Sequence, residues 1–379
     1  MTRNSKPCAP RAQQQSFLLP SSEPVPGLQN GQAGAVRRIA KLHAEHGQAQ
    51  RIATIDQEAT IIASHKAAAL AHSEGGRGYQ PMVAVWAAAD LVVADQFRAG
   101  TVPAKQAPLT CAQMAFAARP AALTARYFRG ASAGHENGLL SWLKDPARAQ
   151  EPGGPIGFAV SAVMSVELQA AVRQVAANAW QTYGQEDDGT RCQWAEVDFV
   201  PGEKSAHKDS HPPRYVGLRL LRAQGVLFAA GTDRHYHAAG TKRKLEGGLL
   251  LDWQREKAGT VEHVHDEVKN WLGGGPLPSQ HFAVTAAWFK LTLLTYNLAS
   301  AIRGLCFSGA ERTGRMQKFR LLLIHLAGRM KRNNCVRGLR LCASREAIAR
   351  RPKVWAVFEL PTHATAAVAL GRGKGGGGG

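Results

Sequence analysis

The stretch Arg51-Ile-Ala-Thr-Ile-Asp56 is an apolar run that ends on a carboxylate. Short runs rich in isoleucine and threonine predict a β-strand. Two further apolar runs, at residues 82–86 and 91–97, are separated by only four residues, which predicts two more strands joined by a tight connection. The three segments together indicate a three-stranded meander near the start of the chain.

Helical and strand-like segments alternate after this meander. Residues 111–122, 136–143 and 166–180 are predicted helices, whereas residues 127–128 and 156–160 are predicted strands. Such alternation is typical of a layered α/β fold with a mixed sheet.

The pattern changes to a strict alternation of apolar and polar side chains after residue 190. Residues 193–200 and 216–220 place apolar side chains at every second position, and residues 226–229 add another apolar run. These segments predict a β-rich insertion at residues 190–250. Helices are predicted after it at residues 261–272, 283–305 and 312–331.

The expected organisation has five parts. Residues 1–50 form a loose segment with one short helix, because Val36, Ile39 and Leu42 recur at helical spacing. Residues 51–189 are the first part of the α/β core, and residues 190–250 are the β-rich insertion. Residues 251–365 hold a core helix and a basic helical C-terminal region, and residues 366–379 form a flexible, glycine-rich tail.

The charge of the chain favours a polyanionic partner. The 379 residues include 47 Lys and Arg against 28 Asp and Glu, a net charge of +19. After residue 300 there are sixteen basic and three acidic residues, so the excess is concentrated at the C-terminal end. Nucleic acid is the first expected partner and an anionic membrane the second. A basic, soluble surface without any partner is the alternative.

The sequence favours a cytoplasmic protein that does not enter a membrane. The longest apolar stretch, residues 282–305, is interrupted by Lys290, Asn297 and Arg303, which is typical of a buried helix. The six cysteines are scattered without Cys-x-x-Cys pairs, which indicates reduced thiols in the cytoplasm.

The segment from Lys257 to Lys269 is the strongest candidate site. Thr260 is a predicted helix N-cap, and on an ideal helix Glu262 and Lys269 lie about 20° apart at the edge of an apolar face. The helix dipole favours the ionised form of Glu262, and Lys269 is placed to meet a phosphate. The alternative is an ordinary amphipathic helix with a solvated polar edge.

Asp56 is the second candidate, because it ends a strand and Glu58 shares its face; the alternative is that it caps a turn. The His-x-His pairs at His235 and His263 lack the spacing of known zinc sites. No phosphate-binding loop or dinucleotide fingerprint is present. A Ser-His-Asp triad remains an alternative, but its Gly-x-Ser-x-Gly motif is absent.

Several stretches resemble bacterial insertion-sequence transposases with a DDE domain, the group 1 family, between about residues 53 and 364. These stretches are Thr54-Ile-Asp56-Gln-Glu, Gly78-Tyr-Gln-Pro81, Ala94-Asp-Gln-Phe-Arg98 and Arg255-Glu-Lys-Ala-Gly-Thr-Val-Glu262. The resemblance implies an RNase H-like mixed-sheet core, interrupted by the β-rich insertion and followed by C-terminal helices.

The resemblance also implies a site. Asp56 and Glu262 are the expected catalytic carboxylates and hold two divalent ions, Mg²⁺ or Mn²⁺, for DNA strand cleavage and transfer. Lys257, Lys269 and Arg255 are the expected DNA contacts. The implied partners are double-stranded DNA of transposon terminal repeats and of the target. The chain is expected to form a homodimer on DNA, associated with the bacterial nucleoid.

One position departs from the family pattern. The second aspartate of the family lies in an Arg-Gly-Asp-Ser-Ala stretch, where this chain has Arg129-Gly-Ala131-Ser-Ala133. Two functions therefore stand beside each other: a DDE transposase that cleaves and transfers DNA strands, and a catalytically inactive DNA-binding relative.

Overall fold

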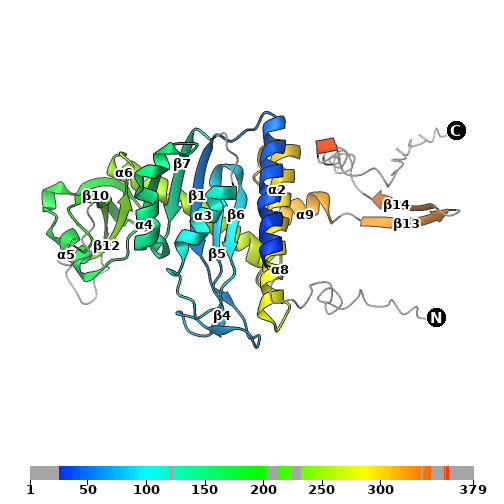
Figure 1. Ribbon diagram of the computed structural model, residues 1–379, viewed down its shortest axis with the longest axis horizontal. Helices are drawn as coiled ribbons and strands as arrows, with labels where there is room; N and C mark the ends of the chain where they lie inside the picture. Colours follow the sequence, from blue (N-terminus) through cyan, green and yellow to red (C-terminus); the bar gives the residue numbers. More distant parts are fainter. Residues whose placement is uncertain are drawn as a thin grey trace, which may run out of the picture. The chain divides into compact units, whose positions relative to one another are not determined.

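The computed structural model describes residues 25–118, 123–202, 211–223, 232–325, 327–333, 336–342, 354 and 356–357. It divides into two compact units, residues 1–300 and residues 301–379. The first unit contains a mixed sheet with nine strands among the described residues, in the order β6-β5-β1-β7-β8-β12-β11-β10-β9 (Figure 1). The strands are β1 (Ile52–Ala59), β5 (Met82–Trp86), β6 (Leu91–Gln96), β7 (Ala125–Gly130), β8 (Ile156–Ser161), β9 (Gln181–Gln185), β10 (Arg191–Val197), β11 (Arg214–Ala223) and β12 (Thr232–Thr241).

The half of the sheet from β6 to β8 forms the core. β1 pairs antiparallel with β5, and β5 pairs antiparallel with β6, which confirms the predicted meander. On its other side β1 pairs parallel with β7, and β7 pairs parallel with β8. Parallel neighbours need crossover connections, which contain α3 (Pro108–Ala118) and α4 (Asn137–Lys144). The predicted α/β fold with a mixed-sheet core is therefore confirmed.

The β-rich insertion extends the same sheet. Strands β9 to β12 form an antiparallel meander, and β12 pairs with β8 through Ala239 opposite Ser161. The meander begins earlier than residue 190, because β9 starts at Gln181 and helix α5 (Val166–Gln174) ends before the predicted residue 180. The apolar run at residues 226–229 lies outside the described residues.

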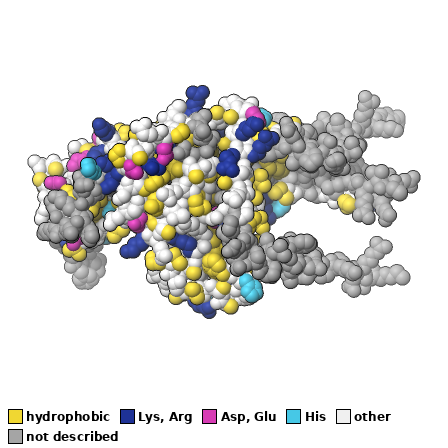
Figure 2. All heavy atoms as spheres, in the orientation of Figure 1, with side chains coloured by type: hydrophobic (Ala, Val, Ile, Leu, Met, Phe, Trp, Pro, Cys, Tyr) yellow, Lys and Arg dark blue, Asp and Glu magenta, His cyan; other side chains and the backbone are white. Residues whose placement is uncertain are grey.

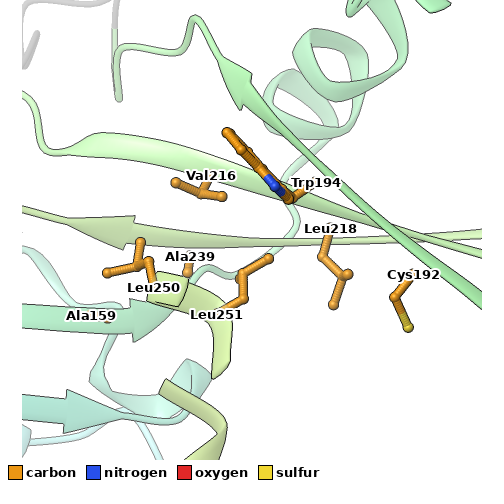
Figure 3. Close-up of a cluster of buried hydrophobic side chains, with 8 residues drawn as sticks. All are labelled: Ala159, Cys192, Trp194, Val216, Leu218, Ala239, Leu250 and Leu251. Atoms are coloured by element: carbon orange, nitrogen blue, oxygen red, sulfur yellow. The ribbon is translucent and has the colours of Figure 1, made fainter. Parts of the chain in front are cut away.

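Helix α6 (Gly247–Arg255) follows the insertion and packs against its strands. A Cβ atom on Gly247 would lie 2.2 Å from the Trp194 ring, so glycine permits the close approach of the helix to the sheet. This packing places the C-terminal end of α6 beside the core. Figure 3 shows the buried cluster: Ala159, Cys192, Trp194, Val216, Leu218, Ala239, Leu250 and Leu251.

Helices cover both faces of the core sheet. On one face, Gln57 Nε2 donates a hydrogen bond of 2.9 Å to the carbonyl of Pro108 at the start of α3. Asp56 precedes Gln57 on β1 and therefore points to the opposite face. There it is contacted by Thr260, directly before helix α7 (Val261–Asp266). The two predicted acids, Asp56 and the one on α7, therefore lie on the same side of the sheet.

Two helices pack at the β6 edge of the sheet (Figure 1): α2 (Val25–Glu45) and α8 (Phe282–Cys306). Gln32 on α2 donates to the carbonyl of Val92, and the Asn297 side chain on α8 bonds both the N–H and the carbonyl of Val92 at 2.7 Å. The helix predicted at residues 283–305 is confirmed. No helix in the described residues is long and apolar enough to span a membrane.

The N-terminal helix corrects one prediction. The sequence predicts a loose chain up to residue 34 and one short helix, whereas α2 begins at Val25 and has 21 residues. Gly27, Gly31 and Gly34 lower the helix propensity of its first half, which hides the helix in the sequence. Packing against the β6 edge stabilises it instead. Residues 1–24 lie outside the described residues.

The second unit corrects another prediction. Helix α9 (Met316–Leu323) is followed by β13 (Ala327–Asn333), which pairs antiparallel with β14 (Val336–Cys342). The helix predicted at residues 312–331 is therefore wrong beyond residue 323. Gly328 lowers helix propensity and the Asn-Asn pair at residues 333–334 favours a turn, so a hairpin is preferred. The glycine-rich tail lies outside the described residues.

A small three-stranded sheet, which the sequence analysis does not predict as such, lies between β1 and β5 in the chain. Its order is β2-β4-β3, with β2 (Ile62–Ala63), β3 (Leu70–Ala71) and β4 (Arg77–Tyr79). Strands of two or three residues carry too little periodicity to be recognised from sequence.

Candidate active site

Asp56 is held by an arginine on the neighbouring strand. Asp56 on β1 lies opposite Arg129 on the parallel strand β7, so both side chains point to the same face. Arg129 Nε donates to Asp56 Oδ1 at 2.6 Å, and Nη2 donates to Oδ2 at 2.8 Å. The Asp56 side chain is 0% exposed and the Arg129 side chain 3%. This is a buried, bidentate ion pair.

Further groups complete the surroundings of this pair. The Thr260 hydroxyl donates to Asp56 Oδ2, while Arg129 Nη1 donates to the Trp253 carbonyl at 2.7 Å and to Glu256 Oε2 at 2.6 Å. Burial alone lowers the pKa of Arg129, but the hydrogen bonds and charges of Asp56 and Glu256 outweigh it and raise the pKa. Arg129 is therefore a buried cation that two carboxylates, Asp56 and Glu256, contact.

A second cation lies between two other carboxylates. Lys257 Nζ is 3.4 Å from Glu58 Oε2 and 3.1 Å from Glu262 Oε1. Glu58 lies two residues after Asp56 on β1 and shares its face. Burial raises the pKa of the Glu58 carboxyl; Lys257 opposes this shift, while the charges of Glu262 and Asp56 add to it. The structure therefore brings Asp56, Glu58 and Glu262 into one acidic cluster.

The comparisons with known proteins identify the family. Residues 28–351 match the family described as Transposase DDE domain group 1. The chain belongs to this family. A search of curated proteins finds no match.

Among solved structures, the chain is similar to a piggyBac transposase in a synaptic complex with hairpin DNA. The two are 9% identical with a TM-score of 0.40, and the match covers 79% of this chain and 58% of that chain. The chain thus matches less than two thirds of the length of that transposase.

DDE transposases use divalent metal ions, and the acidic cluster of this chain does not fit them as it is folded. Both oxygens of Asp56 accept hydrogen bonds from Arg129, and Glu262 pairs with Lys257. Residue 131, where the resemblance to the family leads us to expect a second aspartate, is alanine. Within the described ranges, no group of three or more His, Cys, Asp or Glu side chains is arranged to hold a metal ion. The Arg129 guanidinium lies beside Asp56, and the Lys257 ammonium group lies beside Glu262.

The predicted helix geometry around Glu262 is changed by a π-helical turn. α7 ends at Asp266 and residues Glu267–Trp271 form a π-helix, so the angle of about 20° expected for an ideal helix does not apply. Lys269 Nζ donates to Thr60 Oγ1 at 2.6 Å, and burial lowers the pKa of Lys269. Thr260 occupies the predicted N-cap position, but its hydroxyl bonds Asp56 instead of capping the helix.

The three expected DNA-contacting residues of this DDE-domain chain lie in different surroundings. Lys257 bridges Glu58 and Glu262, and Lys269 is half-buried beside Thr60. Arg255 ends α6 and lies 3.9 Å from Glu186, which follows β9 of the insertion. The structure therefore places Lys257 within the acidic cluster and Arg255 beside the insertion.

The sequence analysis does not identify Arg129 as a site residue, although Arg129 contacts Asp56, Glu256 and the Trp253 carbonyl. A signal exists in the chain: Arg129 precedes Ala131 by two residues, so in a strand both share one face. The parallel pairing that sets Arg129 opposite Asp56 is not encoded in either segment alone.

Proposed function

We propose that this chain takes part in DNA transposition by binding double-stranded DNA, and that it does not cleave DNA strands. The observation that carries the proposal is the buried Asp56 carboxylate, whose two oxygens accept hydrogen bonds from Arg129. A metal ion at Asp56 would have to displace this guanidinium, which would keep only its contacts with Glu256 and the Trp253 carbonyl in a buried position. Of the two functions that the sequence leaves open, we therefore assign to this chain that of a catalytically inactive DNA-binding relative of the transposases.

The position of Ala131 supports the same conclusion. Its backbone is extended, with φ −74° and ψ −178°, and it follows Arg129 by two residues, so its side chain points to the face that carries Asp56. An aspartate there would add a carboxylate to the acidic cluster. The methyl group of Ala131 supplies no ligand.

DNA binding in this proposal depends on phosphate contacts. Arg255, Lys257 and Lys269 lie around the acidic cluster or at the adjoining end of α6. On the face seen in Figure 2, basic side chains form several separate groups and not one continuous patch. We therefore expect many individual phosphate contacts and a strong salt dependence. We further propose that the chain works as a homodimer on terminal-repeat and target DNA, in the bacterial cytoplasm at the nucleoid.

A nicking assay on supercoiled plasmid tests the proposal without knowledge of the terminal repeats. We expect the unaltered chain to leave the plasmid closed in Mg²⁺ or Mn²⁺, and Ala131→Asp to convert it to open circles. Ala133→Asp is the matched control, because it adds the same charge two residues further on. Glu262→Gln in the Ala131→Asp background is expected to abolish the gained activity.

A second function, metal-dependent strand cleavage by the unaltered chain, is favoured by the convergence of Asp56, Glu58 and Glu262. In that case Glu58 replaces the missing second aspartate. Nicking by the unaltered chain that is lost in both Glu58→Gln and Glu262→Gln would establish this function and overturn the inactive assignment.

Lys269→Met is expected to weaken duplex binding with little change in stability. Lys269 is half-buried and has a neutral partner, Thr60, so its removal breaks no ion pair with the residues that the structure describes. Loss of one phosphate contact reduces the slope of log affinity against log salt by about 1. Fluorescence anisotropy of a labelled duplex measures the slope, with the exposed Lys105→Met as the control. A fall of many degrees in melting temperature would assign Lys269 a structural role.

A further inference from the structure

The turn that joins β12 to α6 lines a basic cavity. Its volume is about 480 Å³, and its lining includes Arg214, Lys242, Arg243 and Lys244, with Glu246 as the acidic member. The acidic cluster of Asp56, Glu58 and Glu262 does not include these residues.

The cavity has a surplus of positive charge because four basic residues line it and Glu246 is the one acid among its lining residues. Glu246 Oε2 accepts the N–H of Leu249 at 2.9 Å and so caps α6. Arg214 pairs with Glu196 and donates to the carbonyls of Arg243 and Leu245, which orders the turn. Arg214 thus stabilises the turn. The surplus positive charge is carried by Lys242, Arg243 and Lys244, which follow β12.

These three residues are available to a ligand. Lys242 and Lys244 are exposed and make no hydrogen bond or ion pair with the described part of the chain. Arg243 Nη1 is buried and has no hydrogen-bond partner among the described residues. A buried donor without a partner costs free energy, which an anionic ligand removes. Burial lowers the pKa of Arg243, and the nearby Arg129 charge adds to this shift.

The cavity lies next to the acidic centre. The Arg243 guanidinium is 4.4 Å from the centre of the Tyr127 ring and 4.0 Å from that of Trp253. Tyr127 shares its face of β7 with Arg129, and the Arg129 guanidinium lies 5.3 Å from the same Trp253 ring. The guanidinium that binds Asp56 and the guanidinium at the cavity therefore lie against the same indole ring.

We propose that this cavity binds a phosphate of the DNA backbone, with Lys242, Arg243 and Lys244 as its ligands. The inference rests on the proposed DNA binding and names a place where the duplex is held. Arginine supplies a planar fork of donors that suits phosphate, and two lysines add point charges. Stacking on Tyr127 and Trp253 orients the fork before DNA arrives. A duplex bound here extends along the face of the sheet that carries Asp56.

The test compares two double variants of the full chain. Lys242→Glu/Lys244→Glu changes the cavity, and Lys41→Glu/Lys105→Glu makes the same change of charge elsewhere. Lys105 precedes α3, which covers the sheet face opposite Asp56, and Lys41 lies on α2. Affinity for a labelled duplex of mixed sequence is measured by anisotropy over a range of salt concentrations. Circular dichroism confirms folding, and Lys242→Gln/Lys244→Gln replaces the reversal variant if that variant is unfolded.

We expect the cavity variant to lose at least about tenfold in affinity and about 2 in salt slope, whereas the control variant stays close to the unaltered chain. Equal losses in both variants, or no loss in either, overturn the cavity assignment while DNA binding stands. Absence of duplex binding by the unaltered chain overturns the proposed function itself.

Inorganic phosphate separates a backbone phosphate from a free one. We expect phosphate at high concentration to compete with the duplex on the unaltered chain and to have a smaller effect on the cavity variant. Tight binding of inorganic phosphate that the cavity variant loses, together with unchanged duplex affinity, would overturn the assignment to DNA.

Discussion

We expect replacement of Arg129 with methionine to lower the free energy of unfolding by about 3–5 kcal/mol, because it leaves the Asp56 carboxylate buried without its cation. Methionine fills part of the volume of the arginine stem, so the loss reports the ion pair more than a cavity. Urea unfolding followed by circular dichroism measures the change. A loss below about 1 kcal/mol would contradict the burial of this pair.

Two variants separate the ion pair from other effects of the substitution. Arg222→Met removes the exposed pair of Arg222 with Asp188, whose side chains are 55% and 53% exposed, and is expected to cost less than about 1 kcal/mol. Asp56→Asn together with Arg129→Met removes both charges and is expected to recover part of the loss. A double variant as unstable as the sum of the single variants would show that the two residues do not interact.

Acidification is expected to destabilise the chain through His265. Burial lowers the pKa of His265 from 6.5 to about 3, and the charges of Lys269 and Lys257 add to this shift. Its Nε2 is buried without a hydrogen-bond partner among the described residues. Between these two pKa values the unfolded chain binds a proton that the folded chain does not bind, so stability is lost as the pH falls. The loss begins near pH 6.5 and amounts to about 3 kcal/mol at about pH 4.

Substitution isolates this contribution from the carboxylates that titrate in the same range. His265→Phe removes the titrating group. As the pH falls, the variant is therefore expected to lose less free energy of unfolding than the unaltered chain. The exposed His281→Phe is the control and is expected to follow the unaltered chain. A difference between His265→Phe and the unaltered chain that stays constant from about pH 7 to about pH 4 would show that His265 is accessible to protons in the folded state.

The acidic centre was predictable in part. The apolar run before Asp56 and the amphipathic segment around Glu262 are local patterns, and each identifies one acid from its neighbours in the chain. Glu58 follows from Asp56 by the period of two along a strand. The closure of the centre by Arg129 was not predictable, because it depends on the pairing of β1 with β7 across 73 residues of chain.

The sequence by itself determined the strands of the meander, the helix that carries Glu262, the insertion and the absence of an acid at residue 131. These features follow from local periodicity and from residue identity. Only the tertiary structure decided that Arg129 and Lys257 lie beside the acids, that helix α2 begins at Val25, and that β13 pairs with β14. Each of these outcomes depends on contacts between residues that are not neighbours in the chain, and local propensity is too weak to set them.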